Sequence, residues 1–295
     1  MPGEIKGMSR SISASEFMRD KQGEDRLCLE REERAFWERQ RRCGDDCDLK
    51  MARDLPDDTP QFILRLQREF EDRAAAFSFA GSKGMVLDAG CGNGELLIKA
   101  LEMGMAKENG TRFIGMDFSA NMLGRARFRT SGDPRVAFLQ GSVTSLPFID
   151  RSFDWVVSSG VLTCLATTQS MAEALQEFNR VLRPGGGLVV DFFNRLSHYT
   201  LARRYLFREQ LVPPEYLSFS EFRNQLENAG FHIEEHLGFD FKLCQGYLFM
   251  SRYRPVVDPA YMQERISQLL EKRILPVWPK LSLFGYRIYV RCKKI

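Results

Sequence analysis

The sequence predicts an α/β protein built on an open β-sheet. The first observation is an apolar strand, a glycine-rich turn and the start of an apolar helix in direct succession over residues 86–97, which form the first βα unit of such a sheet. The second is that strand-like segments at 112–117, 136–140 and 188–194 alternate with segments of helical periodicity. At 295 residues the chain is long enough for one large domain with additions.

The composition is ordinary for a globular protein, with 44% hydrophobic and 27% charged residues. The formal net charge of +3 is too small to indicate a nucleic-acid partner by itself. Seven cysteines without a regular framework predict reduced thiols, and no second Cys or His pair joins Cys43 and Cys47 to complete a zinc site. The sequence shows no signal-peptide pattern and no apolar run of membrane-spanning length, so we expect a cytoplasmic protein.

Residues 1–58 are dense in both signs of charge and poor in aliphatic side chains. We expect a charged, partly ordered extension with a helix over 15–42; the alternative is a lid that folds over a bound ligand. The domain proper spans 59–295. It begins with a helix after Thr59-Pro60, because proline suits the first helical turn.

The glycine turn has the pattern Asp88-x-Gly90-x-Gly92-x-Gly94, which differs in spacing from the dinucleotide fingerprint G-x-G-x-x-G. Glycines allow positive φ and let a ligand approach the main chain, and the helix behind them presents unpaired N–H groups. A carboxylate at Asp88 would repel a pyrophosphate and suits a cationic or amine-bearing ligand. A second acid, Asp117, ends the next strand, where ribose hydroxyls would be bound.

Over residues 84–194 the motifs resemble those of class I S-adenosylmethionine-dependent methyltransferases. The chain has the acid and glycines of 88–94, the pattern G-x-D-x-S-x-x-M-L at 115–123, a segment close to G-D-A-x-x-L-P-F at 141–148 and the turn R-x-L-R-P-G-G at 180–186. The resemblance implies a Rossmann-like sheet of seven strands with helices on both faces, its last strand antiparallel beside the fifth. It also implies methyl transfer from S-adenosylmethionine, with S-adenosylhomocysteine as product.

The resemblance further implies which residues contact the cofactor. Asp117 would bind the ribose diol, and Phe118 would pack on the adenine. Ser142 stands where the family commonly has an aspartate that accepts from the adenine amino group, and its hydroxyl can still accept. Thr163-Cys164-Leu165 occupies a position where related proteins often carry histidine, so no histidine mechanism is available there. The expected cofactor-binding residues are Asp88, Gly90, Cys91, Gly92, Gly94, Asp117, Phe118, Met122, Gly141, Ser142, Val143, Ser159 and Gly160.

Beyond Asn194 the resemblance is only architectural. Two insertions, at 195–217 and at 239–284 with a helix over 258–274, would roof the substrate pocket; the alternative is that their aromatic residues form a satellite core. A capped helix opening at Ser218 and a strand over 231–237 separate the insertions. Residues 285–291 alternate polar and apolar, which predicts a final edge strand.

His232 and His236 match the metal motif H-x-x-E-H, but the segment follows a helix stop and is predicted as a strand. On a strand, residues i and i+4 lie roughly 13 Å apart. We therefore expect no metal site.

The predicted function is methylation of a small-molecule or lipid-like acceptor. Two alternatives stay open: an RNA methyltransferase, which the arginines of 195–208 favour, and a non-catalytic scaffold that binds S-adenosylmethionine. The low net charge and the lack of a recognisable RNA-binding module argue against nucleic acid. No residue type and spacing mark a catalytic base. The position-based candidates are Asp191, Asn194, His198, Tyr199 and Tyr216.

Overall fold

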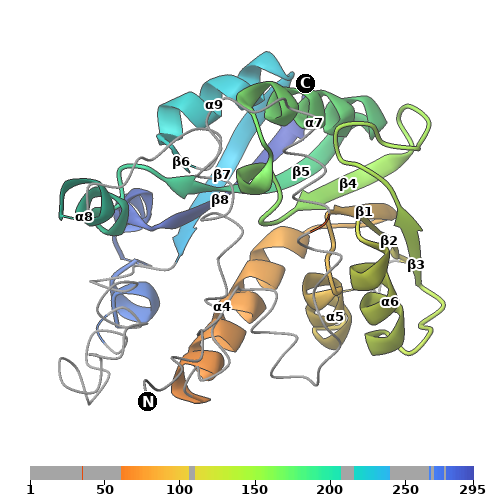
Figure 1. The fold of residues 1–295 in the computed structure, drawn as a ribbon, viewed down its shortest axis with the longest axis horizontal. Coiled ribbons are helices and arrows are strands. Elements are labelled where there is room, and N and C mark those ends of the chain that lie inside the picture. Colours follow the sequence, from red (N-terminus) through yellow and green to blue (C-terminus); the bar gives the residue numbers. More distant parts are fainter. Residues whose placement is uncertain are drawn as a thin grey trace, which may run out of the picture.

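The structure, a computed structural model, describes residues 35, 61–105, 110–206, 216–239, 266, 269–275 and 277–295. Its sheet has the strand order β3-β2-β1-β4-β5-β8-β7, and the two-residue strand β6 pairs with the end of β5 (Figure 1). The strands are β1 (Met85–Ala89), β2 (Arg112–Asp117), β3 (Val136–Gln140), β4 (Phe153–Ser158), β5 (Leu182–Asn194), β6 (Tyr216–Leu217), β7 (Phe231–Phe239) and β8 (Arg287–Lys294).

Neighbouring strands from β3 to β5 are parallel, and β8 is antiparallel to both β5 and β7. This confirms the predicted α/β sheet and the antiparallel last strand beside the fifth. The prediction that the last strand lies at an edge is wrong, because β7 pairs along its other side. Val290 and Tyr289 face opposite layers and both are fully buried, so the alternation along β8 marks two different cores.

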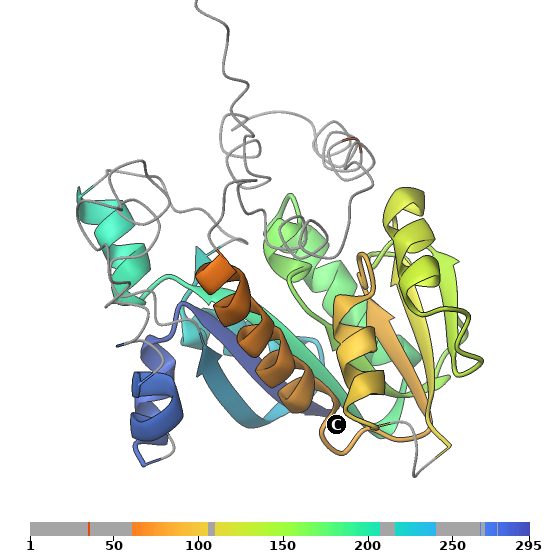
Figure 2. The same cartoon turned by 90° about the horizontal axis from the view of Figure 1, so that it is seen from below.

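Helices cover both faces of the sheet. α4 (Gln61–Phe79), α5 (Glu95–Glu102) and α6 (Ala120–Arg129) lie on one face, and α7 (Thr168–Val181) and α9 (Phe219–Asn228) lie on the other (Figures 1 and 2). Successive residues of β4 alternate between the two cores. Val156 packs in the core that contains the apolar residues of α7 and α9, and Val157 in the core of α4 and α5. Burial on both faces explains the apolar runs of the central strands.

Most predicted element boundaries agree with the structure to within a few residues. The exception is the turn after α7: the helix ends at Val181 and β5 begins at Leu182, so residues 183–187 belong to the strand. The capped helix α9 is confirmed. Ser218 Oγ accepts from the Glu221 N–H, and a Glu221 carboxylate oxygen accepts from the Ser218 N–H.

The first predicted insertion contains α8 (His198–Leu206) and β6. Within the second, the structure describes a π-helical turn, η2 (Leu270–Ile274), and a 3-10 turn, η3 (Pro279–Phe284), which leads into β8. The extension 1–58 and the helix predicted over 15–42 lie outside the described residues except for residue 35. Of the helix predicted over 258–274, residues 266 and 269–274 are described, and its last five residues form η2. No helix in the described ranges is both long and apolar enough to cross a membrane.

Gly187 in β5 illustrates how closely the sheet is packed. A Cβ at this position would lie 2.2 Å from ring atoms of Trp155, and the Trp155 ring is held by its hydrogen bond to the Ser78 carbonyl oxygen (2.8 Å). We expect Gly187→Ala to lower the free energy of unfolding by about 1–3 kcal/mol, because the ring must shift. The matched control is Gly124→Ala in α6, where a Cβ would meet nothing within 4 Å.

Thermal denaturation of the two variants checks this expectation. Gly124→Ala should be neutral or should raise the free energy of unfolding by about 0.5–1 kcal/mol, because alanine is the better helix former. If Gly187→Ala melted at the wild-type temperature, the contact between Trp155 and β5 would be looser than described.

Candidate active site

The glycine turn after β1 has the backbone geometry that its sequence predicts. Gly90, Gly92 and Gly94 have φ angles of 84°, 54° and 80°, values at which any other residue is strained. The turn is tied to the neighbouring strand, because the Gly90 and Cys91 N–H groups both donate to the Met116 carbonyl oxygen (2.7 and 2.9 Å). It ends where α5 begins, so the N–H groups of the first helical turn lie beside it.

Asp117 connects the glycine turn to α6. Its Oδ2 accepts a hydrogen bond from the Gly92 N–H (2.9 Å), and its Oδ1 accepts one from the Ser119 N–H (2.9 Å). Ser119 is the N-cap of α6, and its Oγ accepts from the Met122 N–H. The structure thus brings two sequence motifs together around one carboxylate. A carboxylate is an acceptor with two oxygens, a chemistry that suits hydroxyl donors.

Asp88 is buried at the end of β1, and its Oδ2 has no hydrogen-bond partner among the described residues. Burial, together with the nearby charge of Asp117, raises the pKa of Asp88 to about 7. An unpaired buried carboxylate destabilises the folded state, and groups of this kind concentrate at functional sites. Burial and the same two carboxylates raise the pKa of Cys91 well above its ordinary value, so this thiol stays protonated and is not a nucleophile.

The segment after β3 begins at Gly141, whose N–H donates to the Asp117 carbonyl oxygen (3.0 Å). Val143 is buried and anchors this segment in the core. Ser142 is exposed, and its Oγ lies 2.9 Å from Thr144 Oγ1, so the hydroxyl already takes part in a local turn. Phe118 is half-buried beside this segment's strand, and its carbonyl oxygen accepts from Gln140 Nε2 (2.8 Å).

A buried ion pair lies at the carboxyl ends of β4 and β5. The Arg287 guanidinium pairs with Asp191 Oδ2, and Asp191 Oδ1 accepts from the Gly160 N–H (2.6 Å). Arg287 Nη2 also donates to Ser159 Oγ, which lies 2.7 Å from the Tyr289 hydroxyl oxygen. This network fixes the backbone of Ser159 and Gly160. The sequence analysis missed Arg287; the available signal was a carboxylate in the apolar strand 188–193, which needs a buried partner.

Three of the candidate catalytic bases are buried and make contacts within the protein. Both oxygens of Asp191 are engaged in the network just described. Asn194 is buried, its Nδ2 donates to the Leu283 and Gly285 carbonyl oxygens, and its Oδ1 accepts from the Leu196 N–H. Tyr216 is also buried, inside an aromatic cluster. In the structure each of these side chains stabilises the fold around the site through these contacts.

The other two candidates, His198 and Tyr199, lie half-buried in the first turn of α8. The Tyr199 ring contacts Tyr286 edge-on, with a centroid distance of 4.9 Å. His232 and His236 lie on β7, as predicted. In the part of the chain that the structure describes, no group of three or more His, Cys, Asp or Glu side chains could hold a metal ion.

Sequence comparisons agree with this geometry. A family model described as a methyltransferase domain matches residues 86–186. The chain is 39% identical to a demethylmenaquinone methyltransferase from Chlorobaculum tepidum, over 56% of this chain and 72% of that protein. It is 32% identical to a 2-phytyl-1,4-naphtoquinone methyltransferase from Nostoc punctiforme, over 54% of this chain and 69% of that protein. The chain belongs to the class I S-adenosylmethionine-dependent methyltransferases. It is therefore an enzyme that uses S-adenosylmethionine as its methyl donor.

The fold of this methyltransferase is also that of solved relatives. A methyltransferase solved in complex with the Haloferax volcanii Trm112 methyltransferase activator superposes with a TM-score of 0.55. The superposition covers 84% of this methyltransferase and 96% of the other chain, at 20% sequence identity. At that identity the likeness concerns the fold alone.

Proposed function

We propose that the glycine turn, Asp88 and Asp117 hold S-adenosylmethionine. The buried, unpartnered Asp88 Oδ2 suits the amino group of the methionine part. The Asp117 carboxylate at the end of β2 is an acceptor of the kind that suits ribose hydroxyls. A Cβ on Gly92 would meet no atom of the described residues within 4 Å, which suits a ligand that approaches the main chain of the turn. Gly141, Ser142 and Val143 would then face the adenine together with Phe118 and Met122.

The acceptor we propose is a small aromatic ring of the quinol class, with an apolar body. The observation that carries this proposal is the likeness to two enzymes whose names specify menaquinone-type and phytyl-naphthoquinone substrates, each matched over more than two thirds of its length. Aromatic rings beyond the carboxyl end of β5 support it, because ligands of open α/β sheets bind at that edge. Phe193 stacks on Tyr286 with a centroid distance of 4.9 Å and an interplanar angle of 15°.

S-adenosylmethionine supplies a methyl group on a positively charged sulfur, a good leaving group, so the protein mainly has to position donor and acceptor. Asp191 and Arg287 would do so by fixing the backbone at Gly160, between the donor and the acceptor edge. A quinol loses a proton on C-methylation, and His198 and Tyr199 are the remaining candidates to receive it.

A methyl-transfer assay with labelled donor tests this function. We expect transfer of the label to a chemically reduced demethylnaphthoquinone that carries a short prenyl chain. We expect no transfer to total cellular RNA. Label in RNA alone would contradict the quinol proposal and would identify the protein as an RNA methyltransferase. Tight donor binding without transfer to quinol, RNA or cell-metabolite fractions would favour the non-catalytic scaffold.

Asp117→Ala tests the ribose contact. We expect it to weaken S-adenosylmethionine binding by at least about tenfold, because the variant loses the ribose acceptor and also frees the Gly92 and Ser119 N–H groups. Asp117→Asn keeps one acceptor oxygen and should have an intermediate effect. The control is Asp133→Ala, which removes an acid hydrogen-bonded only to Arg135. Unchanged donor affinity by calorimetry in Asp117→Ala would remove Asp117 from the site.

A further inference from the structure

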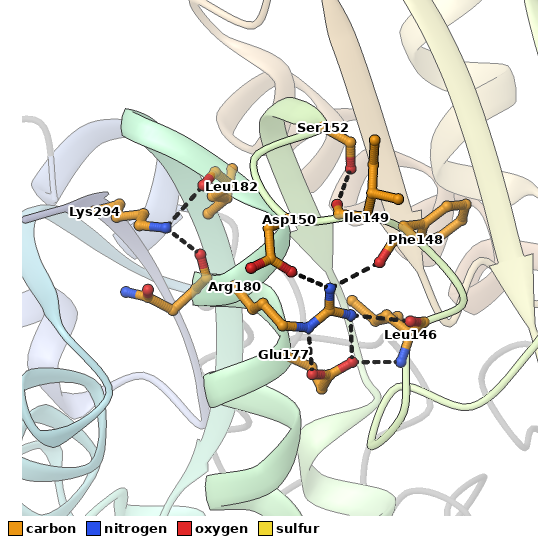
Figure 3. Close-up of polar contacts among 10 residues, drawn as sticks. Leu146, Phe148, Ile149, Asp150, Ser152, Glu177, Arg180, Leu182 and Lys294 are labelled. Carbon is orange, nitrogen blue, oxygen red and sulfur yellow. Dashed lines mark hydrogen bonds and ion pairs between the residues drawn. The ribbon is translucent and has the colours of Figure 1, made fainter.

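Glu177 and Arg180, on the last turns of α7, hold the connection between β3 and β4 by its backbone (Figure 3). Glu177 Oε2 accepts from the Leu146 N–H (2.6 Å). Arg180 Nη2 donates to the Leu146 carbonyl oxygen (3.0 Å), and Nη1 donates to the Phe148 carbonyl oxygen (2.7 Å). The two side chains also pair with each other through Arg180 Nε and Nη2 (2.7 and 2.8 Å). We call this group the α7 clamp.

The clamp adjoins the turn that begins the same connection. Leu146 follows a turn in which the Ser145 N–H donates to the Ser142 carbonyl oxygen (3.2 Å). The start of that turn is fixed on the other side, where the Gly141 N–H donates to the Asp117 carbonyl oxygen. Segment 141–148 is thus bonded to β2 at Gly141 and to α7 at Leu146 and Phe148. Residues 141–143 lie between these two anchors.

The ion pair alone does not account for the arrangement. The Glu177 and Arg180 side chains keep 20% and 31% of their surface exposed, and ion pairs exposed to that extent contribute little stability. The distinctive feature is that three of the clamp's bonds end on main-chain atoms of one connecting segment. Bonds of this kind restrict the conformations of a segment. The Arg180 guanidinium lowers the pKa of Glu177, which keeps the carboxylate charged.

We propose that Glu177 and Arg180 are positioning residues for the adenine end of the donor: they set the placement of residues 141–143 and thereby the affinity for the adenosyl group. This inference rests on the proposed function, which assigns the adenine to that segment. The clamp touches neither donor nor acceptor in this account, so it should act on binding of the donor and not on the transfer step.

The test uses the full chain and two probes, S-adenosylmethionine and 5′-deoxy-5′-methylthioadenosine, which lacks the amino-acid part. We expect Arg180→Met to weaken binding of both probes by about tenfold, equivalent to about 1.4 kcal/mol. The kcat at saturating donor should stay within about twofold of the wild type, because the acceptor edge is untouched. Arg180→Lys should recover part of the affinity, since an ammonium donates to one carbonyl oxygen at a time.

Asp150→Asn is the matched control. Asp150 also pairs with Arg180 (2.8 Å), but its side chain is 70% exposed and holds no backbone atom of the segment, so donor affinity should not change. Glu177→Gln is a second, milder variant that keeps an acceptor for the Leu146 N–H, and it should weaken both probes less than Arg180→Met does. Unfolding curves of each variant confirm that folded protein is compared.

The outcomes separate this inference from the proposed function. If folded Arg180→Met bound methylthioadenosine as the wild type does, or lost kcat at unchanged donor affinity, the clamp would be only a structural brace. If the wild type bound S-adenosylmethionine but Asp117→Ala did not weaken it, the proposed donor site would fail, and the clamp proposal with it.

Discussion

Asp88→Asn is expected to weaken S-adenosylmethionine binding by about 100-fold, equivalent to about 2.7 kcal/mol. The variant removes the negative charge that we pair with the donor's amino group, and the neutral amide oxygen accepts a weaker bond than a carboxylate does. In the wild type, the same affinity should fall as the pH drops below about 7, because the pKa of Asp88 in the free protein is about 7 and only the ionised form binds the amino group. Calorimetric titrations across that pH range measure both effects.

The same substitution should change the pH dependence of stability. The pKa of Asp88 rises from 3.8 to about 7 on folding, so between these values the folded state binds more protons than the unfolded state. The wild type therefore loses stability as the pH rises through this window, by on the order of 4 kcal/mol. Asp88→Asn lacks this loss, so its stability relative to the wild type should be higher at about pH 8 than at about pH 5.

Thermal denaturation at the two pH values supplies that comparison, and any constant cost of burying the amide cancels in the difference. Equal differences between variant and wild type at both pH values would mean that Asp88 is not an ionisable group of perturbed pKa. If Asp88→Asn kept full affinity for the donor, Asp88 would not bind the cofactor.

Gly92→Val is expected to abolish donor binding while leaving the protein folded. Gly92 has φ +54°, so valine there is strained, and its Cβ would enter space that no atom in the described part of the chain occupies within 4 Å. The strain alone should cost about 1–3 kcal/mol of stability. Gly132→Val is the matched control. Gly132 has φ +69° and equally open surroundings, but it lies in the turn between α6 and β3, away from the carboxyl ends of the strands.

Both variants should therefore lose similar stability, and only Gly92→Val should lose the donor. Equal donor affinity in the two variants would show that the ligand does not approach the glycine turn.

The sequence carried enough information for the glycine turn and for Asp117, because local chemistry fixes both. Glycine adopts the positive φ angles of residues 90, 92 and 94 without the strain that other residues meet there, and an acid at the end of a parallel strand lies at the ligand edge of the sheet. The sheet order could be predicted through the family resemblance. The position of β8 in the interior could not be inferred from its alternation, because its polar residues Arg287 and Tyr289 are themselves buried and hydrogen-bonded to distant partners.

Contacts between side chains that are far apart in the chain could not be predicted from the sequence. Asp191 and Arg287 are 96 positions apart, and several cations of the chain could have neutralised the buried acid. For the same reason Asn194 and Tyr216 looked like candidate bases. Their positions near the carboxyl end of β5 were predictable. Their contacts were not, because Asn194 donates to carbonyl oxygens at the end of η3 and just after it, and the Tyr216 hydroxyl contacts that of Tyr286.

Hydrogen–deuterium exchange of the wild type, with and without S-adenosylmethionine, tests the donor site most directly because it reports on the whole chain at once. The account predicts that the donor slows exchange in peptides covering 88–94, 117–122 and 141–143, which meet at the carboxyl ends of β1, β2 and β3. Protection confined to other segments, or no protection by a donor that the enzyme consumes, would contradict it.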